Sequence, residues 1–219
     1  MSTSTSRRRP GRPAKAEAGD TKAALLDAAL RLFAQKGYAG TSIRAIAREV
    51  GLSESVLYAH FDGKQALYDA AMALAGPQAA TVAIDDAPED PAAFVELFAA
   101  RVLTAWDTPR SRQVTSLVSR DGLIHDDALN AGIEDALAHL SEVFAGWLSA
   151  GRIRTDLGGP DDLAYALLAP IAHARVLWLH AEATESQRER ARDRITAHAA
   201  LLGRALSDRS QRPDDRPRP

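Results

Sequence analysis

The chain has 219 residues, 46% of them apolar, which is long enough for one large domain, or for a small and a larger one, with a sizeable core. It contains no cysteine, which excludes disulfides, thiolate metal sites and a cysteine nucleophile and fits a reducing cytoplasm. Residues 1–68 hold 11 Lys/Arg against 6 Asp/Glu, a net +5, and residues 69–219 hold 16 against 23, a net −7, so we expect only the basic head to meet a polyanion.

The sequence predicts no targeting or membrane segment. Three arginines at residues 7–9 lead into no apolar run, so no secretory signal is expected. The longest apolar stretch, residues 163–179, is interrupted by Pro170, His173 and Arg175. It is therefore too short and too charged to span a bilayer.

Both ends of the chain have the composition of unfolded segments. Residues 1–19 are rich in Ser, Thr, Arg and Pro and predict a disordered basic arm, and residues 207–219 predict a disordered tail. Between them Ala and Leu recur with helical periods, and no run of alternating β-branched residues predicts a strand. The fold class predicted is all-α.

The first helix is expected to begin at Asp20 or Thr21, either of which can cap it, and to end at Gly37. The second begins at Thr41 or Ser42. It carries apolar residues at helical spacing, namely Ile43, Ile46, Ala47 and Val50.

Two short helices then follow one another with the spacing of a helix-turn-helix. Gly51 ends the second helix, and Ser53 is the expected N-cap of the third, so that only Gly-Leu-Ser joins them. A fourth helix is expected from Asp62, with Gln65 completing a variant capping box. Buried apolar residues are expected to hold the third helix from one side, which leaves its polar side able to enter a major groove. The residues expected to be exposed on that side are Ser53, Glu54, Ser55, Tyr58, Ala59 and His60.

A longer motif runs through residues 21–68 in order and without gaps. Its members are Ala29, Leu32–Phe33, Gly37–Tyr38, Thr41–Ser42, Ile46–Ala47, Gly51, Ser53, Leu57–Tyr58, His60–Phe61, Lys64 and Leu67. This motif resembles the DNA-binding domain of the TetR family of bacterial transcriptional regulators, over about the first third of the chain. The resemblance implies an all-helical homodimer that binds double-stranded DNA, with a C-terminal domain that usually binds a small ligand which releases the DNA.

The resemblance also implies which residues contact phosphates. Thr41 or Ser42 would do so at the start of the second helix, where free backbone N–H groups favour an anion, although a plain N-cap explains them too. Tyr58 and Lys64 resemble phosphate contacts. Lys64 opposes the dipole of the fourth helix, and a nearby phosphate would explain its place. His60 either touches a phosphate or packs against the first helix.

By the same resemblance, Glu54, Ser55, Val56 and Ala59 would read bases. A carboxylate near phosphates is repelled unless it accepts a hydrogen bond, as from cytosine N4, so Glu54 either reads a cytosine or points away. Val56 and Ala59 are suited to a thymine methyl group.

The arm at residues 7–15 resembles an AT-hook, whose core is Gly-Arg-Pro after a basic residue. Here Pro10 stands between Arg9 and Gly11, and Arg12 follows, so the match is imperfect. Extended arginines suit a narrow A·T minor groove, and a nonspecific basic tail is the alternative.

Five helices are expected in the body, near residues 91–106, 109–121, 126–150, 161–182 and 185–206. One of them carries the stripe Ile133, Leu137, Leu140, Phe144 and Trp147, which is either core or the wall of a cavity. Large or polar residues suited to a ligand site in this body are Trp106, Arg120, His125, His139, Phe144, Trp147 and Trp178.

The last two helices also carry apolar stripes that we expect to pair across a two-fold axis as a four-helix bundle. These stripes are Leu163, Leu167, Ala174 and Leu177, and then Ile195, Ala199, Leu202 and Leu206.

The sequence offers no phosphate-cradling glycine loop and no Gly-x-Ser-x-Gly, and its six histidines are scattered, so no catalytic residue, cofactor or metal site is expected. The expected organisation is an arm (1–19), a DNA-binding head (20–68), a ligand-binding and dimerisation body (69–206) and a tail (207–219). We therefore expect a regulator, a repressor released by a small organic ligand. The alternatives are a regulator without a small ligand and a helical enzyme with a fused DNA-binding head.

Overall fold

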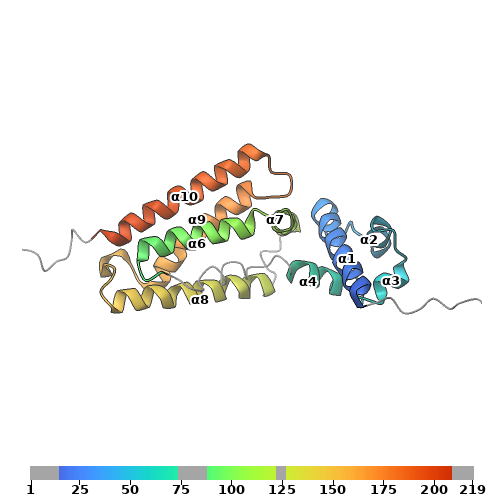
Figure 1. The fold of residues 1–219 in the computed structure, drawn as a ribbon, viewed down its shortest axis with the longest axis horizontal. Coiled ribbons are helices and arrows are strands. Elements are labelled where there is room, and N and C mark those ends of the chain that lie inside the picture. The colour runs from blue at the N-terminus through green and yellow to red at the C-terminus, as the bar shows by residue number, and fades with distance from the viewer. Residues whose placement is uncertain (1–14, 74–87, 122–126, 209–219) are drawn as a thin grey trace, which may run out of the picture.

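A computed structural model describes residues 15–73, 88–121 and 127–208, and the regular structure in these ranges is helical, which confirms the all-α prediction. The helices of the N-terminal part are α1 (Lys15–Lys36), α2 (Ile43–Glu49), α3 (Glu54–Tyr58) and α4 (Lys64–Ala73) (Figure 1). Those of the body are α6 (Pro91–Trp106), α7 (Pro109–Asp121), α8 (Asp127–Ser149), α9 (Pro160–Trp178) and α10 (Glu185–Ser207). A single 3₁₀ turn, Thr155–Leu157, lies between α8 and α9.

The ends of the body helices follow local sequence signals. Asp90 caps α6 by accepting a hydrogen bond from the Ala93 N–H at 2.8 Å, and Pro91 occupies the first helical position. Thr184 and Gln187 form a capping box at the start of α10. Such signals explain why α6 and α10 begin where predicted. α7 also has the predicted bounds, whereas α9 ends at Trp178, earlier than predicted.

Two helix starts were predicted wrongly. α1 begins at Lys15, so Asp20 and Thr21 lie inside it and the predicted arm overlaps its first turns, because residues 15–18 are good helix formers. α4 begins at Lys64, since Gly63 has φ +117° and cannot be helical. The predicted capping box is not formed, because the Gln65 amide donates to Asp69 at 2.7 Å.

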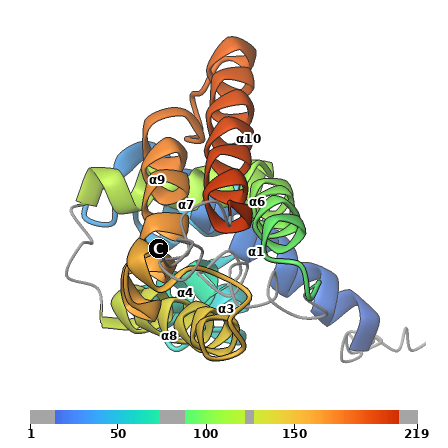
Figure 2. The same ribbon diagram turned by 90° about the vertical axis from the view of Figure 1, so that its left-hand side faces the viewer.

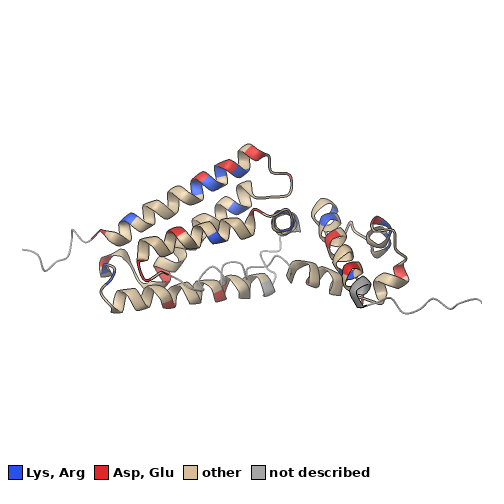
Figure 3. Cartoon of the chain, viewed as in Figure 1, with Lys and Arg blue, Asp and Glu red and all other residues tan. Residues whose placement is uncertain are grey.

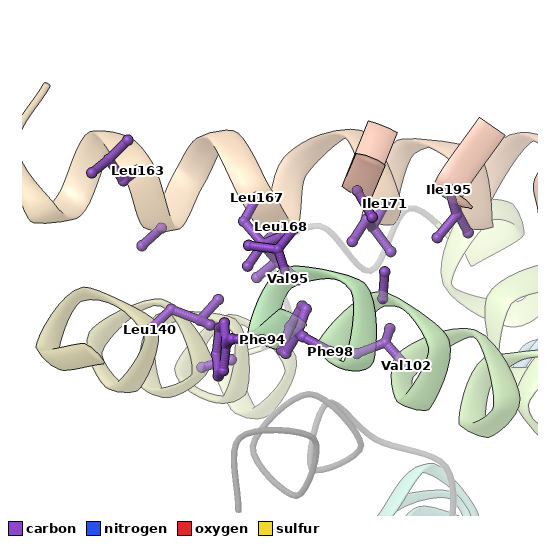
Figure 4. Close-up of a cluster of buried hydrophobic side chains, with 14 of the residues drawn as sticks. Phe94, Val95, Phe98, Val102, Leu140, Leu163, Leu167, Leu168, Ile171 and Ile195 are labelled. Carbon is purple, nitrogen blue, oxygen red and sulfur yellow. The ribbon is translucent and has the colours of Figure 1, made fainter. Parts of the chain in front are cut away.

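The body is a bundle in which α9 packs against α8 and α10, and α10 against α6. Aromatic and aliphatic side chains of these helices interdigitate between them (Figure 4). The backbones of α10 and α6 approach closely where Gly203 meets Ala92, since a Cβ at Gly203 would lie 3.3 Å from the Ala92 Cβ. The fully buried core includes Phe94, Phe98, Leu140, Phe144, Leu167 and Ile171.

This core contains most of the residues that were predicted to pair two chains, so that prediction of the pairing stripes was wrong. The members buried within one chain are Leu163, Leu167, Ala174, Ile195, Ala199 and Leu206, and Leu202 packs against them. Only Leu177 of the two stripes is exposed. A helical apolar stripe fits a core and a dimer interface equally well, so spacing alone did not separate them.

A second core lies in the N-terminal part and extends past residue 68. It joins α1, α2, α3 and α4, reaches Ala71, and also takes in Val114 and Leu117 from α7. α7 lies across the general direction of the body helices, between them and α1 (Figures 1 and 2). The head is therefore packed onto the body through α7.

Within the described ranges, no helix is both long and apolar enough to cross a bilayer. The same ranges contain no grouping of three or more His, Cys, Asp or Glu residues that could hold a metal ion.

Candidate nucleic-acid interface

α2, a tight turn and α3 form a helix-turn-helix. Ser42 caps α2, its hydroxyl accepting a hydrogen bond from the Ala45 N–H at 3.1 Å. The chain then reverses at Gly51, which has φ +70°, and the Leu52 N–H donates back to Ala47 O at 2.8 Å. Of the two predicted starts of α2, Thr41 and Ser42, the N-cap is Ser42, and the predicted end at Gly51 is confirmed.

The third helix is held from one side only. Leu57 of α3 is fully buried against Ile46 and Ala47 of α2 in the core of the head. Ser53 occupies the N-cap position, but its hydroxyl makes no capping bond and instead lies 2.8 Å from the Ser55 hydroxyl. The rest of the short helix faces outward: Ser53, Ser55, Tyr58 and Ala59 are exposed, and Glu54, Val56 and His60 are partly exposed.

Thr41 does not face outward, which argues against its predicted phosphate contact. It is only 3% exposed, and its hydroxyl lies 2.9 Å from Gly37 O and 3.1 Å from Leu32 O. The side chain ties the α1–α2 connection to the end of α1. Of the two predicted hydroxyls, only that of Ser42 is exposed.

Glu54 neither stands free nor points away from α2. Its Oε1 accepts a hydrogen bond from Arg44 Nε at 2.7 Å, and this pair bridges α2 and α3 on the open side of the motif. The pairing raises the pKa of Arg44. Arg44 is not among the predicted site residues, although a basic residue near the DNA-facing side is suited to a phosphate contact.

Lys64 has a partner that the sequence analysis also missed. Its ammonium lies 4.1 Å from the centre of the Tyr38 ring, which itself stacks on Phe33. A cation–π contact therefore accounts for part of the placement of Lys64 at the start of α4. Lys22 lies similarly over Phe61, at 5.5 Å.

The positive surplus of the head comes largely from the arm. Residues 15–68 carry 7 Lys/Arg and 6 Asp/Glu, so the surplus is 7 − 6 = +1, against +5 when residues 1–14 are included. Both acidic and basic side chains lie on α1 and α2 (Figure 3). Arg9 and Arg12, predicted to reach a minor groove, lie outside the described residues.

The residues suggested for a ligand site do not converge. The Arg120 guanidinium is bonded to the carbonyl of Gln35 in α1, and His139 is exposed with Nδ1 2.8 Å from Asp135 O. His125 lies outside the described residues. Phe144 and Trp147 meet edge to face in the body core at 5.5 Å between ring centres, and Trp178 is partly buried beside the same core.

Trp106 differs from the others because a charged group covers it. The guanidinium carbon of Arg175 lies 4.5 Å from the Trp106 ring centre. Arg175 also donates to the hydroxyls of Thr115 at 2.9 Å and Ser111 at 3.3 Å, both buried on α7. In the sequence, Arg175 stands out only because it interrupts an apolar run, and that interruption is the one sign of its role.

An adjacent side of α7 is fixed to the head. Arg110 donates to the Asp27 carboxylate of α1 through Nη2 at 2.5 Å and Nε at 3.1 Å. With Val114 and Leu117 in the head core, α7 contacts both halves of the chain, so a displacement of α7 would be felt by both.

Comparison with known proteins places this motif in one family. Residues 25–71 match the family described as "Bacterial regulatory proteins, tetR family". The HTH-type transcriptional regulator AcrR of Shigella flexneri is 42% identical over 57 residues, 26% of each chain. The IcaR negative transcriptional regulator of the biofilm operon icaADBC from Staphylococcus aureus is 42% identical over 45 residues, 20% of this chain and 24% of that protein. The chain thus spans only about a quarter of the length of these relatives.

Solved structures extend the likeness to the whole fold. NalD, the secondary repressor of the MexAB-OprM multidrug efflux pump in Pseudomonas aeruginosa, matches with a TM-score of 0.68 at 21% identity, over 89% of this chain and 100% of that one. PfmR, a TetR family transcriptional regulator from Thermus thermophilus, matches with a TM-score of 0.63 at 20% identity, over 83% of this chain and 95% of that one.

Proposed function

We propose that this chain, whose residues 25–71 match the tetR family of bacterial regulatory proteins, is a transcriptional repressor that binds a palindromic DNA operator as a homodimer and is released from it by a small organic ligand. The matched family is one of regulators, which favours a regulator over a helical enzyme with a DNA-binding head. A regulator without a small ligand remains the competing proposal.

The observation that carries DNA binding is the one-sided clamping of α3. Leu57 is fully buried, whereas Ser55, Tyr58 and Ala59 on the other side are exposed. A helix of this kind can present its N-terminal residues to base edges in a major groove. The exposed Ser42 at the start of α2 and Lys64 at the start of α4 are the proposed phosphate contacts.

Dimerisation is proposed through the outward sides of α9 and α10. Of the large apolar side chains exposed in the described ranges, most lie on these two helices: Tyr165 at 65%, Val176 at 51%, Leu177 at 43% and Leu201 at 61%. Charged residues crowd the first half of α10 but are sparse in its second half (Figure 3). An exposed apolar surface on two neighbouring helices favours an isologous helical interface.

Release by a ligand requires that the body and head be coupled, and α7 is the proposed coupling element. Arg175 of α9 is bonded to Thr115 on one side of α7, while Arg110 binds Asp27 of α1 on another. A ligand that binds better when α7 is displaced would shift the head in the same step. Linkage then requires that DNA weaken ligand binding by the same factor.

Repression is the direction that the similar proteins favour. IcaR is named a negative transcriptional regulator and NalD a secondary repressor. A repressor of this kind would act on DNA in the cytoplasm, which fits the absence of cysteine.

Selection from a pool of random duplexes with the purified chain tests the proposal. We expect enrichment of palindromes with half-sites about 10 base pairs or a multiple apart, and fluorescence anisotropy should then show a dimer bound to each. A scrambled half-site is the matched control. Failure to enrich any duplex, or enrichment of unsymmetrical sites bound by one chain, would contradict it.

A further inference from the structure

A cationic side chain is partly buried in the body and has only neutral partners. Arg175 sits on α9 between the Trp106 ring and the buried hydroxyls of Ser111 and Thr115. Burial lowers the pKa of Arg175 to about 10, so the guanidinium is still charged at neutral pH. A charge taken from water is expensive unless an opposite charge compensates it.

No carboxylate in the described ranges compensates this charge. The acid next to Trp106 in the chain is Asp107, and both of its oxygens are occupied, Oδ1 by Arg112 at 2.7 Å and Oδ2 by Arg192 at 2.8 Å. Arg192 also reaches Glu185 at 2.5 Å. The acids of this end of the body are therefore paired with other arginines, and Arg175 is left with spare N–H donors.

A second donor in the same place also lacks an acceptor. The indole Nε1 of Trp106 is buried and has no hydrogen-bond partner among the described residues. It belongs to the ring that Arg175 covers at 4.5 Å. A buried N–H without a partner is unfavourable, so this indole beside a guanidinium with a spare N–H group indicates a missing acceptor.

We propose that Arg175 and the Trp106 indole form the subsite for a carboxylate group of an organic effector. A planar carboxylate can accept two hydrogen bonds from one guanidinium and still reach a further N–H. A single arginine among neutral donors matches one negative charge, whereas a phosphate would call for more cations. Val102, four residues before Trp106, and Ile171 and Leu179, four residues to either side of Arg175, are buried and apolar. The rest of the effector is therefore expected to be a hydrocarbon or aromatic body.

This inference rests on the proposed ligand response and names the chemical class of the ligand. Occupation of the subsite would compete for the N–H groups that Arg175 gives to Ser111 and Thr115. Because both hydroxyls lie on α7, the carboxylate would act on the helix that also holds α1.

The test compares acids with their neutral amides on the purified full chain, without DNA. Octanoate is paired with octanamide and benzoate with benzamide, so that each pair differs mainly in charge. Binding is followed by the apparent melting temperature and by tryptophan fluorescence. Arg175→Met removes the proposed charge, and Arg152→Met removes an exposed arginine at Glu89 as the matched control.

We expect at least one acid to raise the melting temperature of wild type and Arg152→Met more than its amide does. In Arg175→Met this preference should fall by at least about tenfold in affinity. Equal binding of acid and amide to wild type, no binding of either acid, or an acid preference retained in Arg175→Met would overturn the proposal. The wild-type comparison holds even if Arg175→Met does not fold. Operator binding by the same preparations is measured separately. If the protein binds operator but shows no preference for acids, only this inference has failed; if it binds no operator, the DNA-binding function has failed.

Discussion

Arg44 Nε and Glu54 Oε1 lie 2.7 Å apart, so the first turn of α2 is bonded to the first residue of α3 across the open side of the helix-turn-helix. The pair has two consequences for DNA binding. It neutralises the carboxylate closest to the proposed major-groove side of α3. It also directs the Arg44 guanidinium, whose side chain is 81% exposed, toward Glu54 and not toward phosphates.

Glu54→Gln should therefore tighten binding to nonspecific duplex, because a carboxylate is lost and Arg44 is released toward phosphates. If Glu54 reads a cytosine, the specific-to-nonspecific ratio should fall at one symmetric pair of positions by about 1–3 kcal/mol. Binding to a set of operator variants at one fixed salt concentration measures both effects. Arg44→Ala, which removes the other member of the pair, is measured alongside. If Glu54→Gln binds every sequence more tightly by the same factor, Glu54 does not recognise a base.

Lys64→Ala should weaken binding to all duplexes alike and lower the magnitude of the salt slope by about one contact. The cation–π contact with Tyr38 orients the ammonium but leaves its N–H groups free to meet a phosphate. The measurement is the dissociation constant at several salt concentrations. Lys36→Ala, an exposed lysine at the end of α1, is the control, and an unchanged slope in Lys64→Ala would show that Tyr38 alone explains its place.

Thr41→Val should lower the stability of the folded head by about 1 kcal/mol, because the side chain keeps its shape but loses its buried hydrogen bond. The salt slope of DNA binding should not change. Ser42→Ala should cost about as much stability through the lost N-cap and should also weaken DNA binding. Urea unfolding and salt titration of both variants test this contrast. A reduced salt slope in Thr41→Val would restore its predicted phosphate contact.

The sequence correctly predicted those helix ends that are set by residues close to them in the chain. Gly51, Ser42 and Pro91 act within a few residues of themselves, and the elements that they bound were predicted correctly. Contacts between distant segments had no such signal. Arg110 meets Asp27 across 83 residues and Arg175 meets Thr115 across 60, and no periodicity reports pairings of this kind.

The prediction that the apolar stripes of the last two helices pair two chains failed for a related reason. Ile195 and Leu201 both lie on α10 and both are aliphatic, but one is 1% exposed and the other 61%. Which side of a helix meets its own chain depends on the placement of its neighbours. Spacing alone does not contain that information.

Leu201→Glu should convert a dimer to a monomer, because it places a charge in the apolar surface proposed to pair two chains. Ile133→Glu is the matched control, an equally drastic change at a 41% exposed apolar residue of α8. Sedimentation velocity at micromolar concentration should show monomer for the first and dimer for the second. Loss of the dimer in Ile133→Glu alone would move the interface to α8.

Arg175→Met should leave the unliganded protein as stable as wild type at pH 7, or more stable. Methionine has a similar length and no charge to desolvate, and the Thr115 hydroxyl keeps its bond to Ser111 O at 3.1 Å. The folded-state pKa of about 10 lies below the ordinary value of an arginine, so the cost of burying the charge is fully present below pH 10 and is relieved as the pH rises through that value. Any advantage of Arg175→Met should therefore begin to shrink between pH 9 and pH 10.5. Urea unfolding of both proteins at these pH values measures it. A loss of more than about 1 kcal/mol at pH 7 would instead assign Arg175 to holding α9 against α7.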